Sequence, residues 1–341
     1  MNDPIALLGV PGSPYTRKML ALMRYRRIPY RLIIGSHRSD VGLPKPKVAL
    51  LPTFYLPDAQ GRIEPVVDST PIIRRLERDV PGRSALPRDP ALAFLDFLLE
   101  DWGDEWLTKA MFHYRWHYAD DIARGREILP RWTVKPVPED ALAPQKRMIG
   151  DRQIARLKVV GSNPVTAPII EASYLRFLEL ASRHLERHPF LLGGRPGAGD
   201  FALYGQLTQL THFDPTPMAL TLARAPRIYA WVDCVDDLSG LEPADDDWFR
   251  ADALPDTLRP MFTEIGRGYV PVMLANAAAV RDGAATVETE VDGARWVQEP
   301  FPYQARCVQW VREAYAALDA GARATVDCVL RGTGCEALVA P

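Results

Sequence analysis

The sequence predicts an α+β protein with two domains and a C-terminal extension. Short apolar runs alternate with helical patterns over residues 1–80, which is typical of a small mixed sheet with crossover helices. Helical patterns dominate residues 91–244 and predict an all-α domain. A proline-rich stretch at 81–90 has the composition of a linker, and the pattern changes again over residues 245–341.

Four strands and two helices are expected in the first domain. Each helix follows a capping residue and a proline, first in Ser13-Pro14 and again in the DSTP stretch at 68–71, a combination that favours a helix start. The expected strands are Ile5–Val10, Tyr30–Ile34, Thr53–Leu56 and Ile63–Val67, with a turn at 58–61 between the last two. This βαβ-ββα order is a thioredoxin-like arrangement.

The extension, residues 245–341, is expected to pack on the helical domain. Apolar residues recur at helical spacing over 265–280 and 303–318, which predicts a helix in each range. Between them, the stretch VETEVDGARWVQ predicts a hairpin that turns at Asp292-Gly293. In the helical domain, the proline-rich residues 130–144 predict a loop.

Composition excludes several classes of protein. The 41 Lys and Arg residues against 43 Asp and Glu give a formal charge of −2, which argues against a nucleic-acid or membrane-surface binder. No apolar run approaches the roughly 20 residues of a membrane span, and the N-terminus lacks signal-peptide features, so the expected location is the cytoplasm. The four cysteines are Cys234, Cys307, Cys328 and Cys335. Any thiol chemistry in the first domain must therefore come from a ligand.

Three features of the first domain point to a ligand site. Ser13 lies at a helix start, where unpaired N–H groups and the helix dipole stabilise an anion such as a thiolate. Pro52 precedes a strand, and a cis bond after Leu51 would expose the Leu51 backbone to a ligand. Asp68-Ser69 begins the next helix and offers groups for an ammonium and a carboxylate. Taken singly, each feature is also explained as an ordinary helix cap or a trans proline.

Together these features give the chain a resemblance to the cytosolic glutathione S-transferase family. The likeness covers about residues 5–240 and rests on the Ser-Pro helix start, LLPTFYL, VVDSTPII and FLLGGRPGAGDFALYGQL. It implies that Ser13 stabilises the glutathione thiolate and that Pro52 is a cis-proline. It also implies that the Leu51 backbone pairs with the cysteinyl unit and that Asp68-Ser69 holds the γ-glutamyl end.

The resemblance further implies an activity and partners. The expected activity is transfer of glutathione, as co-substrate, to a small hydrophobic electrophile, with no metal, in a protein that forms a homodimer. The alternative is a catalytically silent binding or regulatory module with the same fold, since function depends on the site and not on the fold.

Two positions depart from the family pattern. Gly197 stands where a Ser or Thr usually caps a helix of the second domain, with Asp200 three residues later. The basic residue that often precedes the strand-opening proline is absent from Ala49-Leu50-Leu51. The candidates to meet the glycine carboxylate instead are Arg17, His37, Lys45 and Lys47, of which Arg17 and Lys47 are the predicted binding residues.

The acceptor site is expected in the second domain, near its densest aromatic cluster at 112–118. The candidate residues are Tyr15, Trp106, His113 and Tyr114. Packing of this aromatic cluster in the core is the alternative. His113 and His117 stand four residues apart on one helix face, but no third ligand accompanies them, so no metal site is expected.

Overall fold

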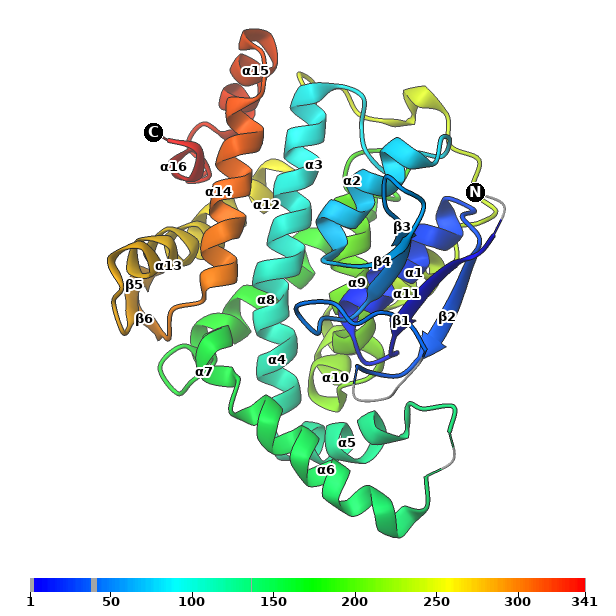
Figure 1. The fold of residues 1–341 in the computed structure, drawn as a ribbon. Coiled ribbons are helices and arrows are strands. Elements are labelled where there is room, and N and C mark those ends of the chain that lie inside the picture. Colours follow the sequence, from blue (N-terminus) through cyan, green and yellow to red (C-terminus); the bar gives the residue numbers. More distant parts are fainter. Residues whose placement is uncertain (1–2, 38–41, 136, 341) are drawn as a thin grey trace.

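A four-stranded mixed sheet forms the first part of the protein, in a computed structural model that describes residues 3–37, 42–135 and 137–340. The strand order is β2-β1-β3-β4, with β1 parallel to β2 and antiparallel to β3, and β3 antiparallel to β4 (Figure 1). The elements are β1 (Ile5–Gly9), α1 (Pro14–Tyr25), β2 (Tyr30–Ile34), β3 (Thr53–Pro57), β4 (Ile63–Val67) and α2 (Ser69–Asp79). The predicted α+β class with a thioredoxin-like first domain is confirmed.

The pairing register brings three chain segments to one edge of this sheet. Leu8, near the end of β1, pairs with Thr53, the first residue of β3, and Thr53 pairs with Val67, the last residue of β4. The residues just beyond these strand ends therefore meet at the same edge, because antiparallel neighbours place the start of one strand beside the end of the next. Ser13, Pro52 and Asp68 all belong to these segments.

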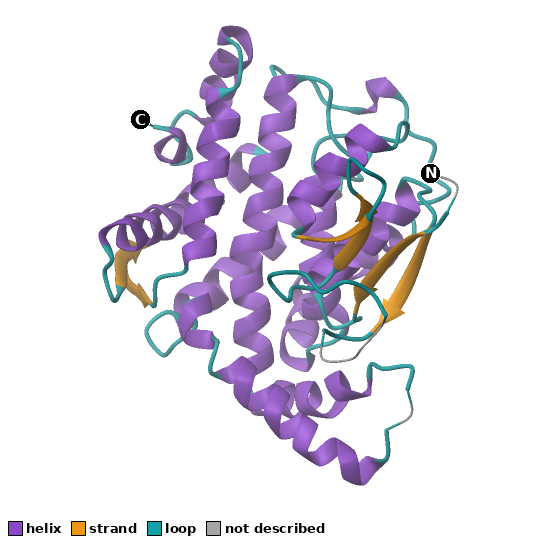
Figure 2. Cartoon of the chain, in the orientation of Figure 1, coloured by secondary structure: helices purple, strands orange, loops and turns teal. Residues whose placement is uncertain are grey.

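A long helical rod runs through the middle of the second part of the chain. It consists of α3 (Pro90–Trp102), a π-helical turn (Gly103–Leu107) and α4 (Thr108–His117), seen in Figure 1 as a nearly straight column. The helices around it are α5 (Ala119–Ile128), α6 (Glu139–Ile154), α7 (Leu157–Val160), α8 (Ala167–Leu185), α9 (Ala198–His212), α10 (Pro215–Arg224) and α11 (Pro226–Asp236). Figure 2 shows that the strands of the described residues belong to the small sheet and one hairpin.

The loop predicted over 130–144 is shorter than expected. A 3-10 turn occupies 129–131, and α6 begins at Glu139 and continues through Pro144. Glu139 and Asp140 lie in the first turn of α6, where negative side chains favour a helix start. The prediction was wrong there because it weighed the prolines and not these acidic residues.

Gly197 caps α9 without a side chain because Asp96 of α3 takes over the capping role. The Asp96 carboxylate accepts hydrogen bonds from the backbone N–H groups of Ala198 and Gly199, each at 3.1 Å. A Cβ added at Gly197 would lie 2.3 Å from Asp96 Oδ1, so a Ser or Thr would have to displace the carboxylate that caps the helix. Asp200 accepts from the Gly197 N–H at 2.9 Å and is fully buried, and burial raises its pKa to about 7.

The extension adds helices and a two-stranded hairpin. Its elements are α12 (Arg259–Glu264), a π-helical turn (Ile265–Tyr269), α13 (Val270–Asp282), β5 (Val287–Val291), β6 (Ala294–Gln298), α14 (Pro302–Ala316), α15 (Ala320–Leu330) and α16 (Glu336–Val339). The predicted hairpin turn is present, and both Asp292 and Gly293 have positive φ, as a tight two-residue turn requires. α14 and α15 lie beside α3 in Figure 1 and contact it.

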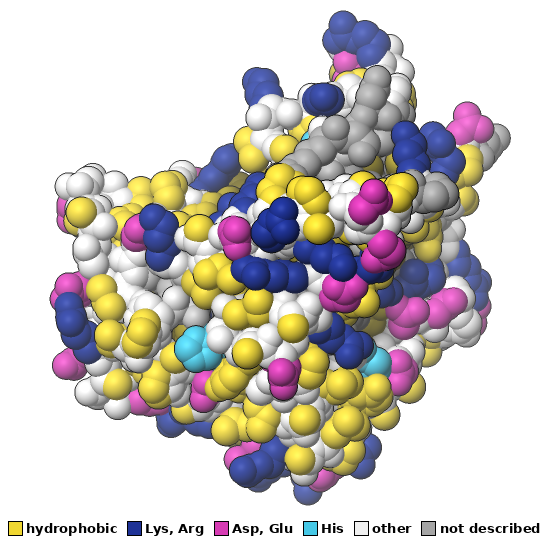
Figure 3. Space-filling view, turned by 90° about the horizontal axis from the view of Figure 1, so that it is seen from below, with side chains coloured by type: hydrophobic (Ala, Val, Ile, Leu, Met, Phe, Trp, Pro, Cys, Tyr) yellow, Lys and Arg dark blue, Asp and Glu magenta, His cyan; other side chains and the backbone are white. Residues whose placement is uncertain are grey.

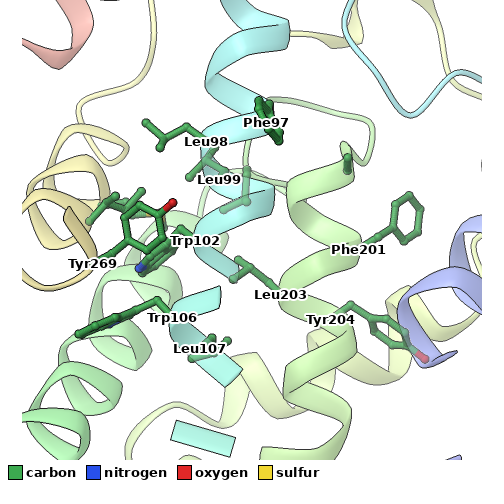
Figure 4. Packing of buried hydrophobic residues seen from close by; sticks show 14 of the residues in the cluster. Phe97, Leu98, Leu99, Trp102, Trp106, Leu107, Phe201, Leu203, Tyr204 and Tyr269 are labelled. Carbon is green, nitrogen blue, oxygen red and sulfur yellow. The ribbon is translucent and has the colours of Figure 1, made fainter. Parts of the chain in front are cut away.

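One hydrophobic core runs through all three parts of the chain. Figure 4 shows Trp102, Trp106 and Tyr269 packed between the central rod and the extension, and Phe201 and Tyr204 of α9 on the other side of the rod. α1 and α9 approach closely at Gly205, where an added Cβ would lie 2.6 Å from the carbonyl oxygen of Pro14. The helix that carries Ser13 is therefore docked directly on the helical domain.

On the face shown in Figure 3, basic side chains lie next to acidic ones. None of the helices in the described part of the chain is long and apolar enough to cross a membrane.

Candidate functional site

The Ser13 hydroxyl joins the start of α1 to the loop before β3. Ser13 is the N-cap of α1, and its Oγ accepts the backbone N–H of Thr16 at 3.2 Å. The same hydroxyl donates to the carbonyl oxygen of Leu51 at 3.3 Å. The Leu51-Pro52 peptide bond is cis. Two of the three predicted site features are therefore in direct contact.

The loop that carries Ser13 is held by the second domain. Arg115 of α4 donates to the carbonyl oxygen of Gly12 at 3.2 Å, and Gln209 of α9 donates to that of the preceding proline at 3.1 Å. Arg115 is itself fixed by three charge-assisted bonds to the buried Asp214, at 2.8, 2.9 and 3.1 Å. A Cβ on Gly12 would lie 2.3 Å from the Trp132 ring, so any other residue would have to displace that ring.

Asp68 and Ser69 lie at the start of α2, and each has a partner from another part of the chain. The Tyr303 hydroxyl of α14 donates to Asp68 Oδ2 at 2.9 Å. Lys18 Nζ of α1 donates to Ser69 Oγ at 3.1 Å. Burial raises the pKa of the Asp68 carboxyl, while the Tyr303 bond and the Lys18 charge oppose that shift. Asp68 has a positive φ of 80°, a strained conformation for a residue with a side chain.

Lys18 is fully buried beneath this pair, between two carboxylates of the central rod. Its Nζ lies 2.7 Å from Glu100 Oε1 and 2.5 Å from Asp104 Oδ2. Thr70 of α2 also donates to Glu100, at 2.9 Å. Burial lowers the pKa of Lys18, but Asp104 and Glu100 outweigh it and hold the pKa above its usual value. The first and second domains thus share a closed charge network directly behind Ser69.

The predicted acceptor residues lie against neighbouring helices. Tyr15 is half-buried, and its hydroxyl donates to the Asp104 carbonyl oxygen at 2.9 Å. Trp106 is 4% exposed and donates to Ser173 at 2.8 Å, while Tyr114 is 1% exposed. A cavity of about 10 Å³ next to Trp106 has room for one water molecule. Trp106 and Tyr114 are thus core residues, as in the alternative explanation of the aromatic cluster.

His113 is also buried and has its ring nitrogens engaged, 2.9 Å from Ser162 Oγ and 3.0 Å from Glu171 Oε1. Its ring stacks on that of His117 with centroids 4.6 Å apart. Among the residues that the structure describes, no three His, Cys, Asp or Glu side chains gather in a group that could hold a metal ion.

The candidate basic residues differ in their contacts. His37 contacts the strand start directly, since its Nε2 lies 2.8 Å from the hydroxyl of Thr53, the residue after Pro52. Arg17 donates through Nε to the backbone of the loop before α1, at 3.2 Å. Lys45 and Lys47 are exposed. His37 therefore joins the predicted Arg17 and Lys47 as a candidate for an anionic ligand group.

Lys18, Arg115 and Tyr303 are residues of the site region that sequence reasoning missed. Lysine and arginine are seldom buried, so the sequence predicts that Lys18, a single lysine within a helix, lies on the surface. Tyr303 was noted only as the start of a predicted helix. The contacts that bring these side chains to the site join residues 51 to 235 positions apart in the sequence. A local sequence pattern therefore cannot predict them.

A second cluster of buried polar side chains lies next to the site and joins the central rod to the extension. Gln304 of α14 donates to Glu105, to its carbonyl oxygen at 3.1 Å and to Oε2 at 3.0 Å. Lys109 donates to Gln304 Oε1 at 3.3 Å. Burial, aided by Asp101, raises the pKa of Glu105 to about 8, and burial lowers that of Lys109 to about 7.

Glu105→Gln is expected to stabilise the protein at alkaline pH. Between its ordinary pKa of 4.5 and the folded value of about 8, Glu105 keeps a proton in the folded protein that the unfolded chain has lost. Stability therefore falls as the pH rises through this window, and a glutamine removes that loss while still accepting from Gln304. Relative to wild type, we expect the variant to gain on the order of 2 kcal/mol between about pH 5 and about pH 8.

Urea unfolding at the two pH values measures this gain. Glu290→Gln, at an exposed position of β5, is the control and should show no such gain. A parallel pH dependence for wild type and Glu105→Gln would show that Glu105 does not carry the effect.

Two family models match the chain. The glutathione S-transferase N-terminal domain matches residues 7–84, and the glutathione S-transferase C-terminal domain matches residues 152–234. No curated protein matches the sequence.

Several solved structures are similar to the chain at low identity. A glutathione S-transferase from Rhodospirillum rubrum is 17% identical, with 76% of this chain and 92% of that one covered and a TM-score of 0.43. One from Methylobacterium radiotolerans, in complex with glutathione sulfonate, is 18% identical, with 74% and 99% covered and a TM-score of 0.41. One from Methylobacillus flagellatus, with glutathione bound, is 16% identical, with 68% and 99% covered and a TM-score of 0.39. Because the identities and TM-scores of these structures are low, the family assignment rests on the two family models.

Proposed function

Since the chain belongs to the glutathione S-transferase family, we propose that it binds glutathione at the sheet edge where Ser13, the cis Leu51-Pro52 bond and Asp68-Ser69 meet. The observation that carries this proposal is the contact between the Ser13 hydroxyl and the Leu51 carbonyl, 3.3 Å apart. It places a hydroxyl donor, a helix N-terminus and a loop backbone around one point, which is what a cysteinyl thiolate requires.

Each part of glutathione has a proposed partner. The thiolate lies at the start of α1 beside Ser13, and the cysteinyl backbone pairs with the backbone of Leu51. Asp68 meets the γ-glutamyl ammonium, and Ser69 with the free N–H groups of the first turn of α2 meets the γ-glutamyl carboxylate. The glycine carboxylate is met by the basic candidates Arg17, Lys47 and His37.

The proposed reaction is attack of the thiolate on a small hydrophobic electrophile. The sulfur electron pair forms the new C–S bond, and the leaving group departs with the electrons of the bond that breaks. The thiol proton has already passed to solvent, because the helix dipole and the Ser13 hydroxyl lower the thiol pKa from its reference of about 8.5. Ser13 turns its hydrogen from the Leu51 carbonyl to the sulfur and accepts no proton.

The thiolate role of Ser13 is tested by titrating bound glutathione. Calorimetry first establishes that wild type binds reduced glutathione, and the ultraviolet absorbance of the thiolate then gives the pKa of the bound thiol. We expect Ser13→Ala to bind glutathione still, and to raise that pKa by about one to two units, since a hydrogen bond to a charged group contributes about 1.5–3 kcal/mol. Turnover should fall about tenfold or more.

Ser13→Gly is the matched control, because alanine also weakens the helix cap whereas glycine costs only a few tenths of a kcal/mol there. The two variants should raise the thiol pKa equally if the hydroxyl is responsible. An unchanged thiol pKa in both would remove Ser13 from the mechanism.

The second candidate is a silent binding or regulatory module with this fold. It is favoured by one observation: Trp106, His113 and Tyr114, the residues expected to contact an acceptor, are buried in the core. Under this alternative wild type shows no heat of binding and no rise in melting temperature with millimolar glutathione, whereas a ligand of the native state must raise it.

A homodimer remains a proposal that follows from the family resemblance, and a cytoplasmic location remains a proposal that follows from the sequence features described above. The mass of the protein in solution, measured by light scattering, tests the first of them.

A further inference from the structure

The hydrogen bond between Tyr303 and Asp68 brings the extension into the proposed glutathione site. The Tyr303 hydroxyl donates to Asp68 Oδ2 at 2.9 Å across 235 residues of sequence. Asp68 is the N-cap of α2, and Tyr303 lies in the first turn of α14. The extension thus contacts the very carboxylate that is proposed to meet the γ-glutamyl ammonium.

Tyr303 is held in a fixed position by its neighbours along the chain. The side chain of the buried Asn276 binds both backbone groups of Phe301, accepting its N–H at 2.7 Å and donating to its carbonyl oxygen at 2.9 Å. On the other side, Gln304 is tied to the carbonyl oxygen and side chain of Glu105 at 3.1 and 3.0 Å. The Tyr303 ring also packs edge-on against Trp310, with centroids 6.2 Å apart. These contacts fix the start of α14 and so hold the Tyr303 hydroxyl next to Asp68.

The bond leaves Asp68 able to bind a second donor. A carboxylate has about four acceptor positions, and Tyr303 uses one of those on Oδ2. Lys18 Nζ, whose charge also acts on Asp68, already has Glu100, Asp104 and Ser69 as partners. Burial and the nearby Glu105, Cys307 and Asp68 raise the pKa of Tyr303, so its hydroxyl remains a donor at neutral pH.

We infer that Tyr303 is a positioning residue of the glutathione site, which holds the Asp68 carboxylate in the orientation that receives the γ-glutamyl ammonium. This inference rests on the proposed function. A carboxylate that is fixed before binding loses less conformational entropy when the ligand arrives, so the orientation increases affinity for that ligand group. The C-terminal extension is then part of the ligand site and not only a cover for the helical domain.

The test compares two ligands in wild type and in Tyr303→Phe. One ligand is reduced glutathione, and the other is glutaryl-cysteinylglycine, which lacks only the γ-glutamyl ammonium. In wild type, calorimetry should show tighter binding of glutathione. In Tyr303→Phe, which keeps the ring and removes the hydroxyl, we expect this preference for glutathione to fall about five- to tenfold, the equivalent of about 1 kcal/mol or slightly more for one lost hydrogen bond.

Tyr315→Phe is the matched control. Tyr315 lies on the same helix, and its hydroxyl likewise donates to an aspartate, Asp327, at an exposed place far along α14 from Asp68. This variant should keep the wild-type preference between the two ligands.

Four outcomes overturn the inference. A Tyr303→Phe protein that keeps the wild-type affinity for both ligands shows that Asp68 needs no positioning. One that loses affinity for both ligands equally, and so keeps the preference, shows a structural role only. A wild type that binds glutathione but prefers it no more than the glutaryl analogue shows that Asp68 does not meet the ammonium. If wild type binds no glutathione at all, the proposed function fails, and the inference fails with it.

Discussion

Replacing Lys18 by methionine is expected to destabilise the protein by about 3–5 kcal/mol, because it leaves buried charges without a partner. Lys18 is fully buried, with Glu100 Oε1 at 2.7 Å and Asp104 Oδ2 at 2.5 Å. Methionine fills a similar volume, so the loss is one of charge and hydrogen bonding and not of packing. Urea unfolding followed by circular dichroism measures the change.

The control is a variant in which the whole charge network is neutralised, so that no buried charge is left without a partner. A variant with Lys18→Met, Glu100→Gln and Asp104→Asn keeps the shapes of the side chains and removes all three charges. Because removing a complete buried ion network often costs little, we expect this variant to recover most of the lost stability. If Lys18→Met alone were within about 1 kcal/mol of wild type, the network would contribute no more than an exposed ion pair.

Trp296→Ala is expected to cost about 3–5 kcal/mol, the range for deleting a large buried side chain. Trp296 lies in the hairpin strand β6 and is fully buried. Its ring is 5.5 Å from that of Trp106 in the central rod, and the ammonium of Lys109 lies 5.6 Å from its ring centroid. The alanine variant therefore loses one of the contacts that join the extension to the helical domain.

Trp310→Ala is the comparison for Trp296→Ala, since Trp310 is also a tryptophan of the extension but only half-buried. We expect it to lose less than half as much stability in the same urea titration. Equal losses would mean that the two tryptophans are equally important to the packing of the extension.

The elements of the first domain could be predicted from the sequence because their signals are local. Ser13-Pro14 is a cap followed by a proline, and the structure begins α1 there. Strands β2 and β4 begin and end at the predicted residues, since each is a short apolar run between turn residues. The hairpin at Asp292-Gly293 was predictable for the same reason, because two adjacent residues determine the turn.

The surroundings of the site could not be predicted, because they depend on contacts between distant segments. The pattern around Trp106 and His113 indicates an aromatic helix, but it does not say whether that helix faces a pocket or a core. In the structure both side chains are buried and hydrogen-bonded to α8, Trp106 to Ser173 and His113 to Glu171. The roles of the predicted site residues and the limits of the domains remain predictions.

The bond between Tyr303 and Asp68 also has a consequence for the order in which the protein is made. Asp68 is synthesised 235 residues before Tyr303. At about 5–20 residues per second this interval is on the order of ten to fifty seconds. Glu105 is likewise synthesised 199 residues before its partner Gln304. Asp68 of the first domain and Glu105 of the central rod therefore leave the ribosome without their final partners, and the site is completed only when α14 has been synthesised.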